Sequence, residues 1–387
     1  MGFTGYTLVM PFVSLYVREL GVTNDAEVAL WTGLALGATP AITAACAPFW
    51  GRIGDRFGNK ILVQRSLLSF IFVMIAMAYV TRAWQLVALR ALQGVVAGYG
   101  GVTISMVALS VPRERMTHAI GLVQTAQRMG PAVGPIIGGI LARVVGMRAS
   151  FFAASAIYLV AFTLLTVMYR EPRRDSAVKL TGDGRVTFGN ILAFENFLLL
   201  MCVIFGLQLV DRSFGPILPL HLERLGYGDR VSIVSGVLFS VLAVSGALGH
   251  GLAASLLRRM SARVAIAAAA VAGAVGLAAF AAGATLWVLV PSMALVGLGI
   301  GTALTAAFSA AGSVIPPDVH GVSFGFLTSA SLIGSAASPV LSGLVVGHSF
   351  TVVFVAGAVT LGVLALAVRR VMVERDLQIE ATPVVEE

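Results

Sequence analysis

The chain has 387 residues, of which 58% are hydrophobic and only 11% are charged, and its formal net charge is +8 at pH 7. Soluble domains are about 25% charged and about 45–50% apolar with glycine included, so this composition excludes an ordinary soluble protein. The mean hydropathy is +0.93, and the apolar runs are continuous rather than alternating, which favours membrane-spanning helices over a β-barrel. The basic residues lie in short segments between these runs and therefore do not indicate binding of nucleic acid.

Apolar runs of about 20 residues, the length of a helix that crosses a bilayer, recur along the whole chain. They predict twelve transmembrane helices, over 1–17, 28–50, 61–81, 84–111, 119–141, 149–169, 197–222, 231–256, 264–283, 286–314, 321–346 and 350–372. We therefore expect an all-α integral membrane protein with a six-helix bundle at 1–172, a cytoplasmic linker at 173–190, a second six-helix bundle at 191–373 and a polar cytoplasmic tail at 374–387.

The two halves repeat one another in sequence, which makes the predicted bundles pseudo-symmetric. Pro11 in helix 1 aligns with Pro216 in helix 7 at an offset of 205. Other landmarks align at offsets of 203 or 204, namely Trp84 and Gly94 with Trp287 and Gly297, and Gly130, Pro135 and Gly139 with Gly334, Pro339 and Gly343. Duplication of this kind typically places a transporter's binding site between the two halves.

Two further expectations concern the ends of the chain. Helix 1 is shorter at its start than its counterpart, because Met1 aligns with Gly206 inside helix 7, so we expect a natural upstream segment that completes it. Lys and Arg concentrate in the even-numbered connections, the linker and the tail. By the positive-inside rule, both termini are expected to face the cytoplasm from the cell membrane.

A charged, glycine-rich segment from Gly51 to Lys60 joins the predicted helices 2 and 3. Its glycines permit a tight turn, and an aspartate compensates the positive end of a helix dipole. A well-capped turn with cytoplasmic positive charges explains the pattern on its own. The segment also resembles the signature between helices 2 and 3 of the major facilitator superfamily, which implies a gating role for Gly51, Asp55, Arg56, Gly58 and Lys60, with Asp55 holding the halves together in one state.

Helix 5 carries a second pattern of small residues. Gly130, Gly134 and Gly138 recur at every fourth position and form a ridge without side chains, along which another helix can approach closely, while Pro135 adds a kink. Ordinary packing of membrane helices is the simpler explanation. Together with Gly139, however, these residues resemble the antiporter signature of the drug/proton antiporter branch of the superfamily.

Two arginines lie inside predicted spans. A charge at the bilayer centre costs about 2.5–3.5 kcal/mol on insertion scales, so such residues usually face a bundle interior or a watery cavity and mark function. Arg90 shares a helix face with Gln93, in a segment that resembles the family's membrane-embedded arginine motif. Arg128 lies four residues after Gln124. We expect both arginines to be functional charges and both glutamines to lie at the substrate cavity.

Asp211 is the only acid well inside a predicted span. Helix 7 places Gln208 three residues before it and Arg212 directly after it, which gives a polar patch with a further cavity candidate in Gln208. A carboxylate in this position is a candidate proton carrier. The alternative is a permanent ion pair with Arg90, Arg128 or Arg212 that only fixes the packing.

The remaining chemistry-bearing residues suggest no catalytic or metal site. The five histidines lie in predicted loops or towards helix ends, where a solvated or interfacial role is expected: His118, His221, His250, His320 and His348. There is no metal-ligand spacing and no set of nucleophile, histidine and acid. We expect no enzyme activity, no cofactor and no metal.

The resemblance to the major facilitator superfamily covers nearly the whole chain and extends to bacterial multidrug resistance efflux proteins. It implies a proton-coupled exporter of hydrophobic or amphipathic small molecules, with partners limited to substrate, protons and the lipid bilayer, and a monomer. A proton-coupled transporter of a defined metabolite is the main alternative, since an anionic metabolite would fit the excess of arginines. A non-transporting membrane receptor is a third interpretation.

Overall fold

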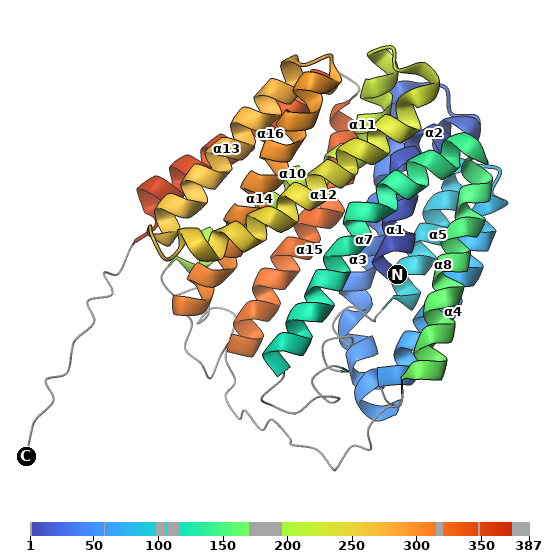
Figure 1. Ribbon diagram of the computed structural model, residues 1–387, viewed down its shortest axis with the longest axis horizontal. Coiled ribbons are helices and arrows are strands. Elements are labelled where there is room, and N and C mark those ends of the chain that lie inside the picture. Colours follow the sequence, from blue (N-terminus) through green and yellow to red (C-terminus); the bar gives the residue numbers. More distant parts are fainter. Residues whose placement is uncertain are drawn as a thin grey trace, which may run out of the picture.

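The computed structural model describes residues 2–57, 59–97, 106, 116–169, 196–314, 320–346 and 349–373. Every regular element in these ranges is helical, and the long helices lie side by side in one bundle (Figure 1). Nine helices among the described residues are long and apolar enough to cross a membrane, and a shorter apolar helix covers Met129–Val144. The structure is that of a multi-pass membrane protein, as the sequence predicts.

Each of the twelve predicted spans contains at least one described helix. The first half comprises α1 (Gly2–Leu8), η1 (Met10–Phe12), α2 (Val13–Glu19), α3 (Asp25–Phe57), α4 (Asn59–Ala78), α5 (Ala83–Val96), α7 (Met116–Val144) and α8 (Met147–Met168). The second half comprises α10 (Phe197–Asp211), α11 (Phe214–Arg224), η3 (Gly228–Arg230), α12 (Val231–Leu256), α13 (Ala262–Ala282), α14 (Leu286–Val314), α15 (His320–Val345) and α16 (Phe350–Val371). The end of the predicted fourth helix, the linker and the tail fall outside the described residues.

The segment predicted as a loop between helices 2 and 3 is largely helical, which corrects the sequence-based expectation. The helix α3 continues to Phe57, and α4 begins at Asn59. Gly51, Asp55 and Arg56 therefore belong to the last turns of α3, where an aspartate cannot cap the start of that helix. Gly58, between the end of α3 and the start of α4, lies outside the described residues.

The predicted helices 1 and 7 are each broken, a few residues apart in the alignment of the repeat. The break in helix 1 contains the 3-10 turn Met10–Phe12, and the break in helix 7 follows Asp211, where α10 ends. Because proline has no backbone N–H, Pro11 and Pro216 cannot donate to the carbonyl groups four residues earlier, those of Thr7 and Arg212. The two prolines thus explain why both helices are interrupted beside the centre of the bundle.

The two halves meet through two equivalent helix pairs, α3 with α15 and α7 with α12. A Cβ atom added to Gly33 would lie 2.1 Å from the carbonyl oxygen of Pro339, and one added to Gly236 would lie 2.4 Å from that of Pro135. These contacts correspond under the sequence repeat, because Gly33 aligns with Gly236 and Pro135 with Pro339. The same backbone contact is therefore made twice, as expected for two related bundles.

The glycine ridge of helix 5 packs against α1 within the first half. A Cβ on Gly138 would lie 1.6 Å from the carbonyl oxygen of Leu8, and one on Gly134 would lie 2.3 Å from Thr7 Oγ1. Gly139 faces the other half, since its Cβ would lie 2.3 Å from the carbonyl oxygen of Ser232. The ridge thus joins α7 to α1 on one side and to α12 on the other.

Replacing Gly138 with alanine should destabilise the protein. The added methyl group would force α1 away from α7, and overpacking of this kind costs about 1–3 kcal/mol. The Gly138→Ala variant is expected to lower the thermal unfolding midpoint of the purified protein by about 2–6 °C. Gly251→Ala on α12 is the matched control, because nothing lies within 4 Å of its Cβ position. Equal midpoints for the two variants would contradict the close contact.

Candidate functional site

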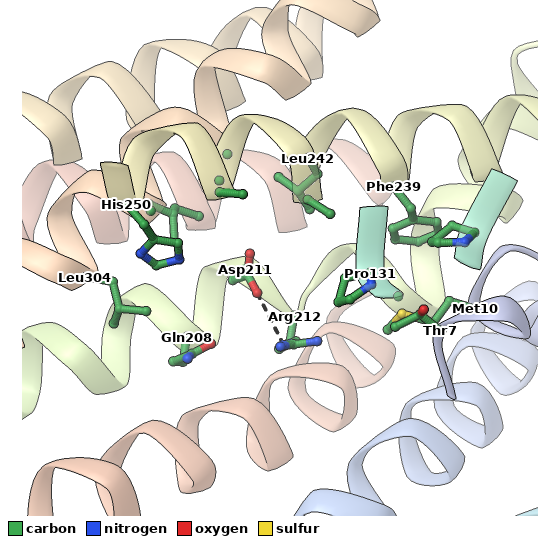
Figure 2. A pocket seen from close by; sticks show the side chains of 18 of the residues that line it. Thr7, Met10, Pro131, Gln208, Asp211, Arg212, Phe239, Leu242, His250 and Leu304 are labelled. Carbon is green, nitrogen blue, oxygen red and sulfur yellow. Dashed lines mark ion pairs between the residues drawn. The ribbon is translucent and has the colours of Figure 1, made fainter. Parts of the chain in front are cut away.

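A cavity of about 520 Å³ lies between the two halves. The first half contributes lining residues from α1, η1 and α7, and the second half contributes residues from α10, α11, α12 and α14. Most of the lining is apolar, with Met10 and Phe239 towards one end and Leu304 towards the other (Figure 2). Gln208, Asp211 and Arg212 follow one another along α10 and its end. The cavity offers an amphipathic ligand both an apolar surface and a local charged group.

Asp211, Arg212 and Gln208, the polar residues near the end of α10, all line this cavity. The Arg212 Nε atom lies 3.2 Å from Asp211 Oδ2, and the two side chains are 41% and 26% exposed (Figure 2). Gln208 Nε2 donates to Ser331 Oγ on α15 at 2.9 Å. The break after α10 places the ion pair at a helix end, where the negative end of the helix dipole favours the arginine.

The first half faces this ion pair with uncharged groups. At the repeat offset of 205, Tyr6 and Thr7 are the counterparts of Asp211 and Arg212, and they line the same cavity. The Thr7 hydroxyl donates to the carbonyl oxygen of Gly130 at 3.1 Å, which ties α1 to the antiporter-like segment of α7. The charges of the cavity therefore come from the second half alone, among the residues that the structure describes.

Arg90 and Gln93 form a separate, fully buried pair in the first half. Arg90 Nη1 donates to Gln93 Oε1 at 3.2 Å, and the guanidinium carbon lies 5.6 Å from the centre of the Tyr6 ring. Neither Arg90 nor Gln93 is among the residues that line this cavity. The ring of Tyr6 contacts the guanidinium group of Arg90 and also lines the cavity, so it links Arg90 to the cavity.

Several other predicted site residues lie wholly or partly outside the described structure. The helix α7 includes Arg128 and Gln124, but their side chains are outside the described set, as are those of Gly51, Asp55 and Arg56, and Gly58 is outside it altogether. Lys60 Nζ donates to the carbonyl oxygens of Thr166, at 3.1 Å, and Tyr169, which ties α4 to the end of α8 within the first half.

An ion-pair network that the sequence did not indicate joins the halves beyond one end of the cavity. Arg18 at the end of α2 forms ion pairs with Asp25 and with Glu223 at the end of α11. Arg224 donates to Asp25 Oδ2 from both Nε, at 3.1 Å, and Nη2, at 2.8 Å. We call these four residues the Arg18 cluster, and the end of the bundle that they join is labelled by α2 and α11 in Figure 1.

The sequence repeat could have predicted that the Arg18 cluster joins the two halves. At the offset of 205, Arg18 and Glu19 align with Glu223 and Arg224, so equivalent positions carry opposite charges. The ends of α2 and α11, which meet between the two halves, therefore carry charges that attract rather than repel one another. Glu19 turns to its own half, where Arg148 Nε lies 3.8 Å from its carboxylate.

Two histidines occupy positions that differ from the sequence-based expectation. His250 on α12 lines the cavity, and its Nδ1 atom lies 2.6 Å from Thr305 Oγ1 on α14. His221 is buried at 8% exposure among the rings of Phe280, Phe350 and Phe354, so it is neither solvated nor interfacial. Among the described residues, no group of three or more His, Cys, Asp or Glu could hold a metal ion.

Two curated relatives resemble the chain in sequence. The multidrug resistance protein MdtG of Proteus mirabilis is 34% identical over 245 residues, which are 62% of this chain and 60% of the relative. The MdtG protein of Yersinia enterocolitica is 35% identical over 242 residues, covering 62% of this chain and 58% of the relative. The matched region thus spans about three fifths of the length of these relatives.

The fold resembles solved transporters, and a family model covers most of the chain. The crystal structure of a D-xylose-proton symporter superposes with a TM-score of 0.78 at 12% identity, over 96% of this chain and 95% of that one. The nucleoside transporter NupG superposes with a TM-score of 0.73 at 15% identity, over 95% and 96% of the two chains. Because the Major Facilitator Superfamily model matches residues 1–339, the chain belongs to the major facilitator superfamily.

Proposed function

We propose that this protein is a secondary active transporter that exports hydrophobic or amphipathic small molecules, drugs among them, in exchange for protons. The observation that carries this proposal is the cavity between the two halves, which combines an apolar lining with the Asp211–Arg212 ion pair. Apolar and aromatic side chains bind such molecules with little dependence on shape. The names of the MdtG relatives support the same substrate class.

Transport would proceed by alternating access between the first bundle, 1–172, and the second, 191–373, with 173–190 as a cytoplasmic linker and 374–387 as a cytoplasmic tail. The Arg18 cluster and the paired glycine contacts support a conformation that is closed at the Arg18 end. With both termini in the cytoplasm, this end faces outwards. The protein would work as a monomer in the cell membrane, with substrate, protons and lipid as its only partners.

The proposed roles of the site residues follow from their positions. Asp211 and Arg212 determine the net charge of the cavity, and proton coupling depends on that charge. Gln208 contacts the substrate. Arg90, held behind Tyr6, and Arg128 are further intramembrane charges of the coupling system. The segment around Asp55 and the ridge from Gly130 to Gly139 govern the movement of the halves, since the ridge contacts both α1 and α12.

A transport assay in proteoliposomes tests this function. Each charge that moves through a membrane potential of 100 mV supplies about 2.3 kcal/mol, which supports an accumulation of about 50-fold. With an imposed pH gradient, a cationic amphipathic dye should move against its own gradient, and collapse of the pH gradient should abolish that movement. Gradient-dependent movement of organic anions, without movement of dye, would instead identify a metabolite carrier.

A further inference from the structure

We propose that His250 binds the exchanged proton, and that this proton and a cationic amphipathic substrate exclude one another from the cavity. The inference rests on the proposed function and names the proton-binding group and the substrate class for the same site. It starts from the position of His250, which extends into the cavity from α12 while Asp211 extends into it from α10 (Figure 2).

The imidazole of His250 is held in place by its surroundings. Thr305 Oγ1 lies 2.6 Å from Nδ1, and the hydroxyl group can donate to this nitrogen or accept from it. The backbones of α12 and α14 are in close contact beside it, since a Cβ on Gly249 would lie 2.4 Å from the carbonyl oxygen of Leu298. Thr302 Oγ1 also donates to the carbonyl oxygen of Gly249 at 3.1 Å. The histidine thus lies on a rigid pair of helices.

The charged groups around His250 are few. Besides His250, the charged residues that line the cavity in the described part of the chain are Asp211, at the end of α10, and Arg212, which follows it. Tyr6 of α1 adds a phenol group to the lining. The helix α14 contains no charged residue. Other elements that contact α12 also carry charged or titratable residues. Those whose side chains the structure describes lie outside the cavity lining: Arg143, His221, Glu223, Arg224, Asp229 and Arg230. The side chains of His118 and Arg128 on α7 are outside the described set.

This arrangement makes His250 the group that decides the net charge of the cavity. The charges of Asp211 and Arg212 cancel, because the two side chains form an ion pair at 3.2 Å. Histidine is the side chain whose charge ordinarily changes within the physiological pH range. Among the lining residues that the structure describes, the net charge is therefore zero when His250 is neutral and +1 when His250 is protonated.

A cavity with a net positive charge repels a cationic substrate, whereas a neutral cavity admits it. The proton on His250 and the substrate therefore compete for the cavity. Competition of this kind is what an exchanger requires, since carrying both ligands together would dissipate the gradient. The repeat supports a role specific to the second half. At offsets of 203 to 205, the residues of α3 that align with His250 are Ala45, Cys46 and Ala47, so the first half has no equivalent imidazole.

The test measures binding of tetraphenylphosphonium to the purified full chain as a function of pH. In the unmodified protein, affinity should fall with the slope of one proton, by up to about tenfold per pH unit, as the pH is lowered from about 7.5 to about 5.5, the interval in which histidine side chains ordinarily gain charge. His250→Asn should bind the cation at pH 7.5 and lose this dependence. His221→Asn, which removes a histidine outside the cavity, should keep the one-proton slope.

The outcomes separate this inference from the proposed function. A His250→Asn protein that keeps the full pH slope would overturn the inference while leaving drug export intact. An unmodified protein that neither binds the cation nor moves it under a pH gradient would overturn the function itself. If His250→Asn does not fold, Thr305→Val supplies the test, because loss of its hydroxyl partner should move the midpoint of the pH dependence but keep its slope. An unmoved midpoint would then contradict the proposal.

Discussion

The Arg224→Glu variant is expected to open the Arg18 end of the bundle and to reduce transport about tenfold. The substitution replaces the attraction between Arg224 and Asp25 by repulsion and adds a second acid beside Glu223. These side chains are 27–59% exposed, so each pair is worth only about 0.2–1 kcal/mol. Reversal of the sign at a contact between the halves changes the free energy of closure by about 1–2 kcal/mol, enough to shift the populations about tenfold.

Spin-label distances measure this opening directly. Labels at Thr23→Cys and Asp229→Cys, in a chain whose two free cysteines Cys46 and Cys202 are replaced, report on the separation of the halves at the Arg18 end. The distance distribution should move to longer values in Arg224→Glu. Salt should have a similar but smaller effect on the unmodified chain, because it screens exposed charges.

Two further variants make the interpretation specific. Reversal of all four charges, in Arg18→Glu, Asp25→Arg, Glu223→Arg and Arg224→Glu together, makes every pair of the Arg18 cluster attractive again and should restore closure and much of the transport. Arg148→Glu reverses the ion pair with Glu19 inside the first half and should leave the distances unchanged. Opening in Arg148→Glu, or no recovery in the fourfold variant, would refute a gate between the halves.

The helices could be predicted from the sequence because their cause is local. A run of apolar residues long enough to cross the bilayer must form a helix to satisfy its backbone, so the predicted spans 231–256 and 286–314 coincide with α12 and α14. The breaks near Pro11 and Pro216 also have a local cause in the missing N–H groups. The end of α3 was placed too early, because glycine and charge lower hydropathy at Gly51 to Arg56 without stopping the helix.

The candidate site was only partly predictable because it depends on contacts between distant segments. Neighbouring residues on one helix, such as Asp211 and Arg212, were found together, and their ion pair is one of the alternatives that the sequence left open. The separation of Arg90 from the cavity follows from the rotation of α5, which hydropathy does not determine. The cavity position of His250 was missed for the same reason, since α12 is apolar on nearly all sides.

Asp211→Asn is expected to reduce gradient-driven export of a cationic dye at least tenfold while the protein still folds. The substitution leaves Arg212 as an uncompensated charge in the cavity, which then repels both a cationic substrate and a proton on His250. Two like charges about 4 Å apart at an effective dielectric constant of about 20 repel by about 4 kcal/mol, and about a third of this energy already lowers affinity tenfold. The measurements are dye transport and dye binding, with Asp229→Asn, an exposed acid outside the cavity, as the matched control.

The double variant Asp211→Asn/Arg212→Gln decides what Asp211 does. If the carboxylate serves to compensate Arg212, removal of both charges makes the cavity neutral again, and dye binding and export should recover to within about threefold of the unmodified protein, the usual limit of context-dependent effects. If Asp211 itself carried the proton, the double variant would bind dye but remain uncoupled from the pH gradient. The ion pair at 3.2 Å favours the first outcome, because proton binding at Asp211 would have to disrupt that pair in every cycle, whereas His250 can gain and lose a proton with the pair intact.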